Sequence, residues 1–386
     1  MLHGGNLMRK YLFVLVVLFT FNLYACDVIN KGGDSTKPGI HGADDITLTA
    51  GGAFDPLEGV SARDENGNDI TDTIEISGLE HLRMVDGKVY EVGEFIVVYE
   101  TKTYSAARAV TILEGSGASD NVLLECGNPF IGDYVITWCD EFTGEGENLN
   151  DFGVDLDKWG FQIGTGAEYG LTGWGNYEAQ YYREENARVE DGRLIIEARK
   201  ESFGGMDYTS ARLWTKPTFH QTYGRFEAKI KLPVGDGLWP AYWMMPQDDV
   251  YGGWAASGEI DIMEAKGRYP NQSIGALHFG GSWPNNTHTH QVYYFPSGIS
   301  IADFNVYAIE WEEDVIRWYV NDVLIKTSRS WYTEGHDFPA PFDQDFYLLL
   351  NLAIGGSFDG GILPPDSLFD EPVLMEIEYV RVYQKD

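Results

Sequence analysis

The sequence predicts an all-β protein made of a small β-sandwich followed by a large one. Short runs rich in β-branched and aromatic residues recur along the chain between Gly, Asn and Asp turns. No long segment carries the apolar period of a helix. The 386 residues are 44% hydrophobic and 14% aromatic, which allows a sizeable core and excludes global disorder.

The first residues indicate export. Arg9 and Lys10 precede an apolar run at 11–21, which is too short to span a bilayer and is followed by Leu-Tyr-Ala-Cys. This ending resembles the bacterial lipobox, in which Cys26 becomes the lipidated first residue. We therefore predict a lipoprotein-type signal peptide at 1–25 and an exported protein held at the outer membrane or cell surface by its lipid alone. The alternative is an ordinary signal peptide with an incidental Cys.

The small domain is expected between two segments that lack an apolar period. Residues 26–43 predict a tether and residues 115–121 a linker, because both are rich in Gly and polar residues. Between them, 44–114 resembles bacterial immunoglobulin-like modules and predicts a small β-sandwich. It shows neither an aromatic platform nor acids at metal spacing, so a spacer is favoured over a carbohydrate-binding module. Strands are expected at 46–49, 74–76, 88–90, 94–99 and 107–112.

Residues 122–386 predict one large sandwich, since about 265 residues with a dozen or more strands fit one such domain better than two. Two cysteines remain here besides Cys26. In an exported chain the pair Cys126 and Cys139 suggests a disulfide, with two buried free thiols as the alternative. Clear strands are expected at 193–198, 224–232, 316–320, 346–350 and 375–383.

The acidic run at 259–264 carries the strongest chemical indication. In a strand Glu259 and Asp261 share a face, while strict alternation would send Glu264 to the other face and put Met263 beside the acids. One β-bulge would return Glu264 to the acidic face. Crowded carboxylates cost free energy and raise at least one pKa, so a purely structural strand has little reason to hold three.

Retaining glycosidases do use such a pair, one ionised carboxylate and one protonated acid about 5–5.5 Å apart. Inward-leaning side chains on one strand suit that separation, and Asp261 between the two would orient the first and help separate their pKa values. The alternative is a solvated acidic face in a protein that is acidic everywhere. The chain has 60 Asp and Glu against 27 Lys and Arg, a net charge of −33. That field argues against nucleic acid and disfavours sulfated polysaccharides.

The surroundings of the acidic run resemble glycoside hydrolase family 16, in its laminarinase-like branch. The resemblance spans nearly all of 122–386 in order, and it implies a β-jelly-roll sandwich. It also implies that Glu259 is the nucleophile, Asp261 its supporting residue and Glu264 the general acid/base. The two residues between Asp261 and Glu264 are typical of the bulged branch. The motifs are DEFTG (140–144), GNYEAQYY (175–182), TSARLWTK (209–216), YGRFEAKIKLPVGDGLWPAYWMMP (223–246), VYGGWAASGEIDIMEAKG (250–267), LHFGGSWPNN (277–286), LNLAIGG (350–356) and YVRVYQ (379–384).

A sugar cleft needs flat apolar platforms and hydrogen-bond donors. For each tryptophan named below the alternative is packing in the core. For each arginine it is a structural ion pair, and for the histidine it is a core position with satisfied hydrogen bonds. Trp239 and Trp243 lie four apart in one predicted strand, so they share a face. The substrate-binding residues expected from the resemblance are Asn176, Arg212, Arg225, Trp239, Trp243, Trp254, His278 and Trp283.

Many family members hold a structural Ca²⁺ on the convex side. The matching positions are the carbonyls of Glu141 and Gly192 and the acid Glu378, although the family usually has the shorter Asp at the last position. We expect catalysis to need no cofactor or metal. The resemblance thus implies a monomeric, endo-acting retaining β-1,3-glucanase acting on laminarin-type β-glucan. The alternatives are an agarase-like or other galactan hydrolase of the same branch, and a noncatalytic glucan-binding surface protein.

Overall fold

A computed structural model describes residues 36–385 of the chain, apart from positions 50, 80, 81, 83, 86, 90–92, 114–125 and 129. The predicted signal peptide and Cys26 lie outside the described residues. The chain divides into two compact units, Met1–Glu114 and Gly115–Asp386. The all-β prediction is confirmed, because the described residues form strands and only short 3-10 helices. None of the described helices is long and apolar enough to cross a membrane.

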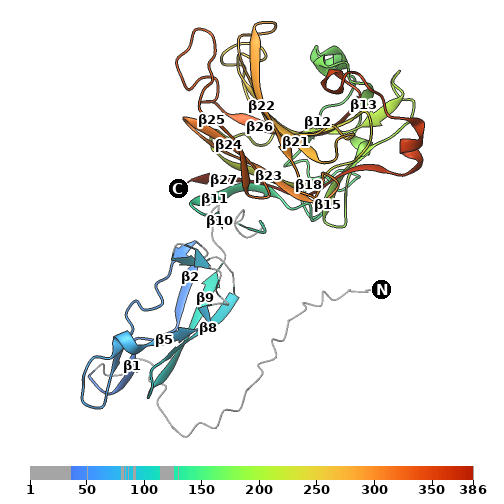
Figure 1. Cartoon of the computed structure of the whole chain (residues 1–386). Helices are drawn as coiled ribbons and strands as arrows, with labels where there is room; N and C mark the ends of the chain where they lie inside the picture. The colour runs from blue at the N-terminus through green and yellow to red at the C-terminus, as the bar shows by residue number, and fades with distance from the viewer. Residues whose placement is uncertain are drawn as a thin grey trace, which may run out of the picture. The chain divides into compact units, whose positions relative to one another are not determined.

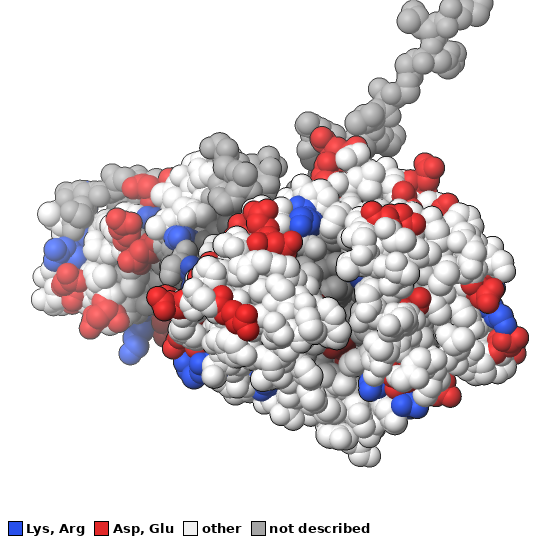
Figure 2. Space-filling model, turned by 90° about the horizontal axis from the view of Figure 1, so that it is seen from above, with Lys and Arg blue, Asp and Glu red and all other residues white. Residues whose placement is uncertain are grey.

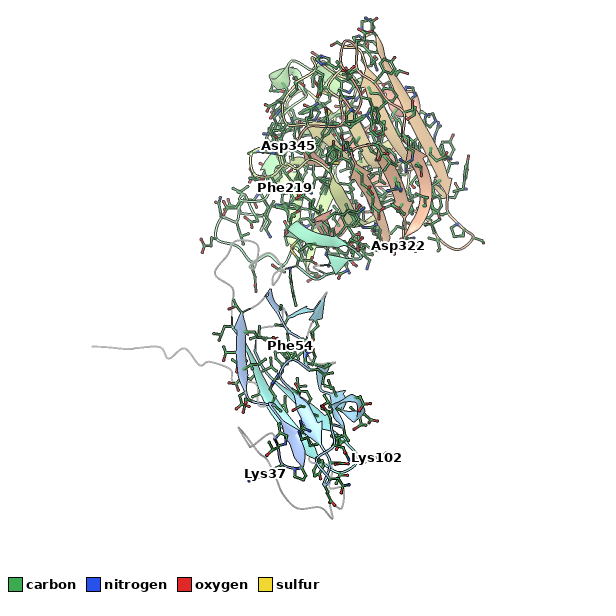
Figure 3. All side chains as sticks on the ribbon, turned by 90° about the vertical axis from the view of Figure 1, so that its left-hand side faces the viewer. Lys37, Phe54, Lys102, Phe219, Asp322 and Asp345 are labelled. Carbon is green, nitrogen blue, oxygen red and sulfur yellow. A yellow bond between two sulfur atoms is a disulfide. The ribbon has the colours of Figure 1, made fainter. Side chains whose placement is uncertain are left out.

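The first unit is built from three small sheets around its own core. Its largest sheet has the order β2-β9-β8-β5, in which β2 and β9 are parallel and the other pairs antiparallel. Phe54, labelled in Figure 3, belongs to the buried cluster of this unit. The immunoglobulin-like character of the module stays a prediction. The strands are β1 (Gly39–His41), β2 (Ile46–Thr49), β3 (Gly52–Ala53), β4 (Ser61–Arg63), β5 (Glu75–Ser77), β6 (Met84–Val85), β7 (Lys88–Val89), β8 (Gly93–Glu100) and β9 (Ser105–Leu113).

The second unit is a two-layer sandwich, visible in Figure 1 as two stacked sheets. One sheet has seven strands in the order β12-β17-β26-β19-β20-β21-β22. All of its pairs are antiparallel. It carries the acidic run and is called the cleft sheet below. Its strands are β12 (Gly160–Phe161), β17 (Arg212–Trp214), β19 (Leu238–Pro246), β20 (Glu259–Glu264), β21 (Gln272–Gly280), β22 (Asn286–Tyr294) and β26 (Phe346–Ile354).

The other sheet, called the outer sheet below, has nine strands, with β14 and β15 joined to it through β27. A single buried apolar cluster fills the space between the two sheets, and it includes alternate residues of β18 such as Phe226, Ala228 and Ile230. Its strands are β10 (Phe130–Ile131), β11 (Tyr134–Asp140), β14 (Ala187–Glu190), β15 (Arg193–Ala198), β18 (Gly224–Lys231), β23 (Asn305–Glu312), β24 (Val315–Val320), β25 (Val323–Ser328) and β27 (Val373–Lys385).

Connections between strands supply the remaining elements. Cys126 and Cys139 form a disulfide that ties the start of the second unit to β11. The predicted disulfide is therefore confirmed, and the alternative of two free thiols is not found. Two further strands, β13 (Gln180–Tyr182) and β16 (Tyr208–Ser210), form a separate two-stranded parallel sheet. The 3-10 helices are η1 (Thr71–Thr73), η3 (Ala167–Tyr169), η4 (Thr172–Gly175), η5 (Glu184–Asn186), η6 (Ser357–Asp359) and η7 (Asp366–Asp370).

Candidate active site

The acidic strand β20 contains the predicted bulge. Asp261 pairs with Ala276 of β21 and Glu264 pairs with Ile274, so two residues of β20 lie opposite Gly275 alone. Those two residues, Ile262 and Met263, both belong to the buried cluster between the sheets. Glu264 therefore returns to the face that carries Glu259 and Asp261, and the bulge predicted from alternation is confirmed.

A tryptophan from the outer sheet supports the bulge from below. Trp318 of β24 is fully buried and donates its indole N–H to the carbonyl of Asp261 at 2.9 Å. The residue opposite the bulge is Gly275, where an added Cβ would lie 2.5 Å from Trp318 Cδ1. Gly275 thus leaves the space that the indole occupies, and the indole satisfies a carbonyl at the irregular point of the strand.

The first carboxylate, Glu259, is held by an indole and an imidazole. Its Oε2 accepts a hydrogen bond of 2.7 Å from Trp254 Nε1, and its Oε1 lies 3.7 Å from His278 Nε2. The same His278 Nε2 is 3.4 Å from Asp261 Oδ2. Burial alone would lower the pKa of His278, but Glu259 and Asp261 raise it to about 10. His278 is therefore a cation that pairs with both carboxylates.

The second carboxylate, Glu264, lies in a different environment. It is buried, and its Oε1 accepts one hydrogen bond of 2.9 Å from Trp239 Nε1. Burial, followed by the charges of Asp261 and Glu259, raises its pKa well above the ordinary value. Burial and Asp261 also raise the pKa of Glu259, but His278 and the Trp254 N–H oppose that rise. Glu264 is thus the group that keeps its proton, and Glu259 is the group that ionises more readily.

Aromatic side chains flank the carboxylates. Trp239 stacks on Phe358 with ring centroids 4.8 Å apart, and Trp254 lies 6.3 Å from Trp283. Trp283 is 72% exposed, so it is not a core residue. Viewed from above, the molecule is hollowed, and most residues around the hollow are uncharged (Figure 2). Exposed indoles beside buried acids suit an uncharged sugar chain.

On the other side of β20, Arg212 lies between two indoles. Its guanidinium carbon is 4.6 Å from the Trp174 ring and 4.8 Å from the Trp243 ring. Trp243 in turn donates its N–H to Asn351 Oδ1 at 2.7 Å. The predicted residue Asn176 follows η4, and its carbonyl accepts a hydrogen bond of 2.7 Å from the Ser357 amide. Arg212 and Trp243 are therefore fixed in direction before any ligand arrives.

Comparisons with known proteins agree with this geometry. The model of the Glycosyl hydrolases family 16 matches residues 175–357. A Niallia circulans protein named Glucan endo-1,3-beta-glucosidase A1 is 43% identical over 67% of this chain and 39% of its own length. A Cryptopygus antarcticus protein named Glucan endo-1,3-beta-glucosidase is 39% identical over 65% of this chain and 92% of its own. The laminarinase catalytic domain from Thermotoga maritima is 37% identical, with a TM-score of 0.57 over 66% of this chain and 99% of that domain.

The chain belongs to glycosyl hydrolase family 16. Its second unit has the jelly-roll sandwich of the solved laminarinases, as the sequence predicted. This family 16 hydrolase covers nearly the whole of the Cryptopygus relative but less than half of the Niallia relative.

The prediction that Arg225 binds the substrate of this family 16 hydrolase is wrong. Arg225 lies in β18 of the outer sheet and alternates with the core residue Phe226, so it points away from the cleft sheet. It pairs with Glu227 at 2.9 Å and with Glu310 and Asp322 at 3.3 and 3.2 Å; Figure 3 labels Asp322. Arg225 therefore forms structural ion pairs, which was the alternative to substrate binding.

The acid predicted as a calcium ligand has another partner in this structure. The carboxylate of Glu378, the only charged ligand in the set, lies 2.6 Å from Lys229 Nζ. Ca²⁺ needs six to eight oxygen ligands, and here an ammonium occupies the one acid that would supply charge. Elsewhere in the described chain, donor atoms of Glu259, Asp261 and His278 lie within 4.8 Å of one another, but these are the reactive groups themselves.

A buried acid beside the cleft was missed. Glu178 Oε2 accepts hydrogen bonds from Gln180 Nε2 at 2.7 Å and Tyr182 OH at 3.0 Å, and its Oε1 is 3.5 Å from Asn176 Nδ2. Tyr182 OH accepts a further bond of 3.1 Å from Asn351, the partner of Trp243. The signal was present in GNYEAQYY, where acid, amide and phenol recur at every second residue and so share a face.

Proposed function

We propose that this hydrolase is an endo-acting β-1,3-glucanase that cuts laminarin-type glucans with retention of configuration. One observation carries the chemistry: Glu259 and Glu264 lie on one face of one strand, yet only Glu264 is placed to keep its proton. The names of similar proteins support the substrate, since two are named glucan endo-1,3-beta-glucosidase and one solved structure is named a laminarinase catalytic domain.

In the first step Glu264 donates its proton to the leaving glycosidic oxygen while the Glu259 carboxylate attacks the anomeric carbon. The bond to the leaving sugar breaks and a glycosyl ester of Glu259 forms. The cationic His278, which also pairs with Asp261, holds Oε1 of Glu259. The Trp254 N–H donates to Oε2 of Glu259 and fixes its position.

In the second step water attacks the same anomeric carbon from the face that the leaving sugar vacated. Glu264, now a carboxylate, takes the proton of that water, and the ester bond to Glu259 breaks. Each step inverts the carbon, so the product keeps the configuration of the substrate. Both carboxyls end in their starting protonation states.

Product analysis tests this function. The chain is incubated with laminarin, mixed-linkage β-glucan, agarose and κ-carrageenan, and reducing ends and product sizes are followed. We expect rapid loss of chain length on laminarin, and NMR of the first product should show the β-anomer. Cleavage of a galactan with laminarin intact would replace the substrate, and binding of laminarin without any cleavage would favour a noncatalytic protein.

The matched control is Glu259→Gln, which keeps shape but removes the nucleophile. Loss of a nucleophile costs several orders of magnitude in kcat, so turnover at the wild-type rate would remove the mechanism.

We also propose that the hydrolase is exported and anchored by lipid at Cys26. The apolar run at 11–21, the lipobox-like ending and the disulfide between Cys126 and Cys139 support this, because disulfides persist outside the cytoplasm. Expression in a bacterial host tests it. Wild-type protein should sediment with membranes and Cys26→Ala should be released, whereas membrane association of the variant would contradict lipidation.

A further inference from the structure

The cleft sheet continues past the carboxylates through β21 to its edge strand β22. The register places His278 directly opposite Glu259, and His288 of β22 directly opposite His278. His290 lies opposite Ala276, which is itself opposite Asp261. Residues directly opposite on paired strands share a face.

These imidazoles form a row, defined here as the histidine row: His278, His288 and His290. The first two ring centroids are 5.3 Å apart with planes inclined by 24°, and the last two are 5.6 Å apart at 21°. The neighbours of His278, Leu277 and Phe279, belong to the buried core, so the row faces the cleft. His278 is half-buried against the carboxylates, while His288 and His290 are exposed.

The edge strand under the row is held from the outer sheet. Thr289, between the two exposed histidines, accepts bonds from Lys326 Nζ at 2.9 Å to its carbonyl and 3.1 Å to its hydroxyl. Lys326 lies over the ring of Trp318 at 4.4 Å, the same indole that supports the bulge. An edge strand pinned in this way presents His288 and His290 on a fixed surface.

A polymer cut in its interior must lie on both sides of the scissile bond. On the side of β19 and β17, Trp243 and Arg212 supply a platform and donors. On the opposite side of β20 the row supplies flat rings whose nitrogens each give or accept a hydrogen bond. Partial burial of its ring and the neighbouring cation His278 lower the pKa of His288, so its ring suits hydroxyls better than anions at pH 7.

We propose that His288 and His290 form a sugar-binding subsite for a neutral hexosyl unit, across the catalytic strand from Arg212. This subsite rests on the proposed endo-glucanase function, because it needs a chain that extends past the point of cleavage. It assigns a binding role to the edge strand β22.

The test compares His290→Ala with Gln291→Ala on β-1,3-linked gluco-oligosaccharides of increasing length. His290 is the better target because its ring stacks on His288, whereas His288 also stacks on His278, which contacts the carboxylates. Gln291 is exposed on the same strand and faces the other way. We expect His290→Ala to lower kcat/KM on the longer oligosaccharides about 3- to 10-fold, the worth of one hydrogen bond, and to shift the main cleavage position.

The shortest oligosaccharide that is cut should be cut at an unchanged rate, and Gln291→Ala should behave as wild type. Equal effects of the two variants, or a loss by His290→Ala that is the same at every length, would overturn the subsite. Wild-type enzyme that leaves all β-1,3 oligosaccharides intact would instead overturn the proposed function, so the two failures are distinguishable.

Discussion

Trp318 donates its indole N–H to the carbonyl of Asp261 at 2.9 Å, from one sheet of the sandwich to the bulge in the other. The bond joins residues 57 positions apart in the chain. Trp318 is fully buried, so a residue outside the cleft contacts the strand where the bulge returns Glu264 to the acidic face.

Replacing Trp318 by Phe should therefore affect catalysis as well as stability. The buried carbonyl of Asp261 loses its partner, which costs about 1–3 kcal/mol of unfolding free energy. A shifted acid/base costs further in kcat, about 10- to 100-fold for a displacement near 1 Å. Urea unfolding and initial rates on laminarin measure the two effects.

The control is Trp311→Phe, since Trp311 is equally buried and donates to the Phe342 carbonyl at 3.2 Å, away from the carboxylates. It should lose similar stability and keep kcat. Equal losses of kcat in both variants would show that the bulge has no special dependence on Trp318.

Gly275→Ala should act through the same indole. The new Cβ would lie 2.5 Å from Trp318 Cδ1, so overpacking should cost about 1–3 kcal/mol. In a Trp318→Ala background that clash disappears, so the two changes should be strongly non-additive in a double-mutant cycle of unfolding free energies. Simple additivity would place the strain elsewhere.

Trp254→Phe should move the acidic limb of the pH profile upward. The indole N–H stabilises the ionised form of Glu259 through a 2.7 Å bond, and its loss raises the pKa of that carboxyl further. A nucleophile with a higher pKa is protonated at higher pH, so kcat/KM should begin to fall at a higher pH on the acid side. A charge-assisted bond is worth about 1.5–3 kcal/mol. Trp283→Phe, at the exposed rim, should leave the limb in place.

Glu178→Gln tests the buried acid that supports Asn176. The amide can still accept from Gln180 and Tyr182, but it then turns an NH₂ group toward the Asn176 amide, donor against donor. We expect KM to rise about 3- to 10-fold with a smaller change in kcat. If Glu178 acts through Asn176, adding Asn176→Ala should change little more, whereas fully additive losses would separate the two residues.

EDTA should leave the thermal unfolding temperature unchanged, because Lys229 pairs with Glu378 at the expected calcium position. An ion bound at 100 times its Kd would add about 2.7 kcal/mol and raise the midpoint by several degrees. The double variant Lys229→Ala with Glu378→Asp, which restores the shorter acid and removes the cation, should gain a response to CaCl₂. A clear drop of the wild-type midpoint in EDTA would contradict this.

Much of the site followed from local pattern. Alternation in β20 placed Glu259 and Asp261 together, and the misplaced Glu264 required a bulge, which the register shows. Side-chain alternation and turn chemistry are set by neighbouring residues, so they can be inferred without a fold.

The sequence by itself determined the all-β class, the bulged acidic strand and the family. The tertiary structure decided which side chains surround the acids. Arg212 and Arg225 both lie in matching motifs, yet one is in the cleft sheet between two indoles and the other is in the outer sheet among acids. The contact of Trp318 with Asp261 and that of Lys229 with Glu378 likewise join distant segments. Strand pairing within a sheet and the packing of the two sheets bring such residues together, and no local period encodes either.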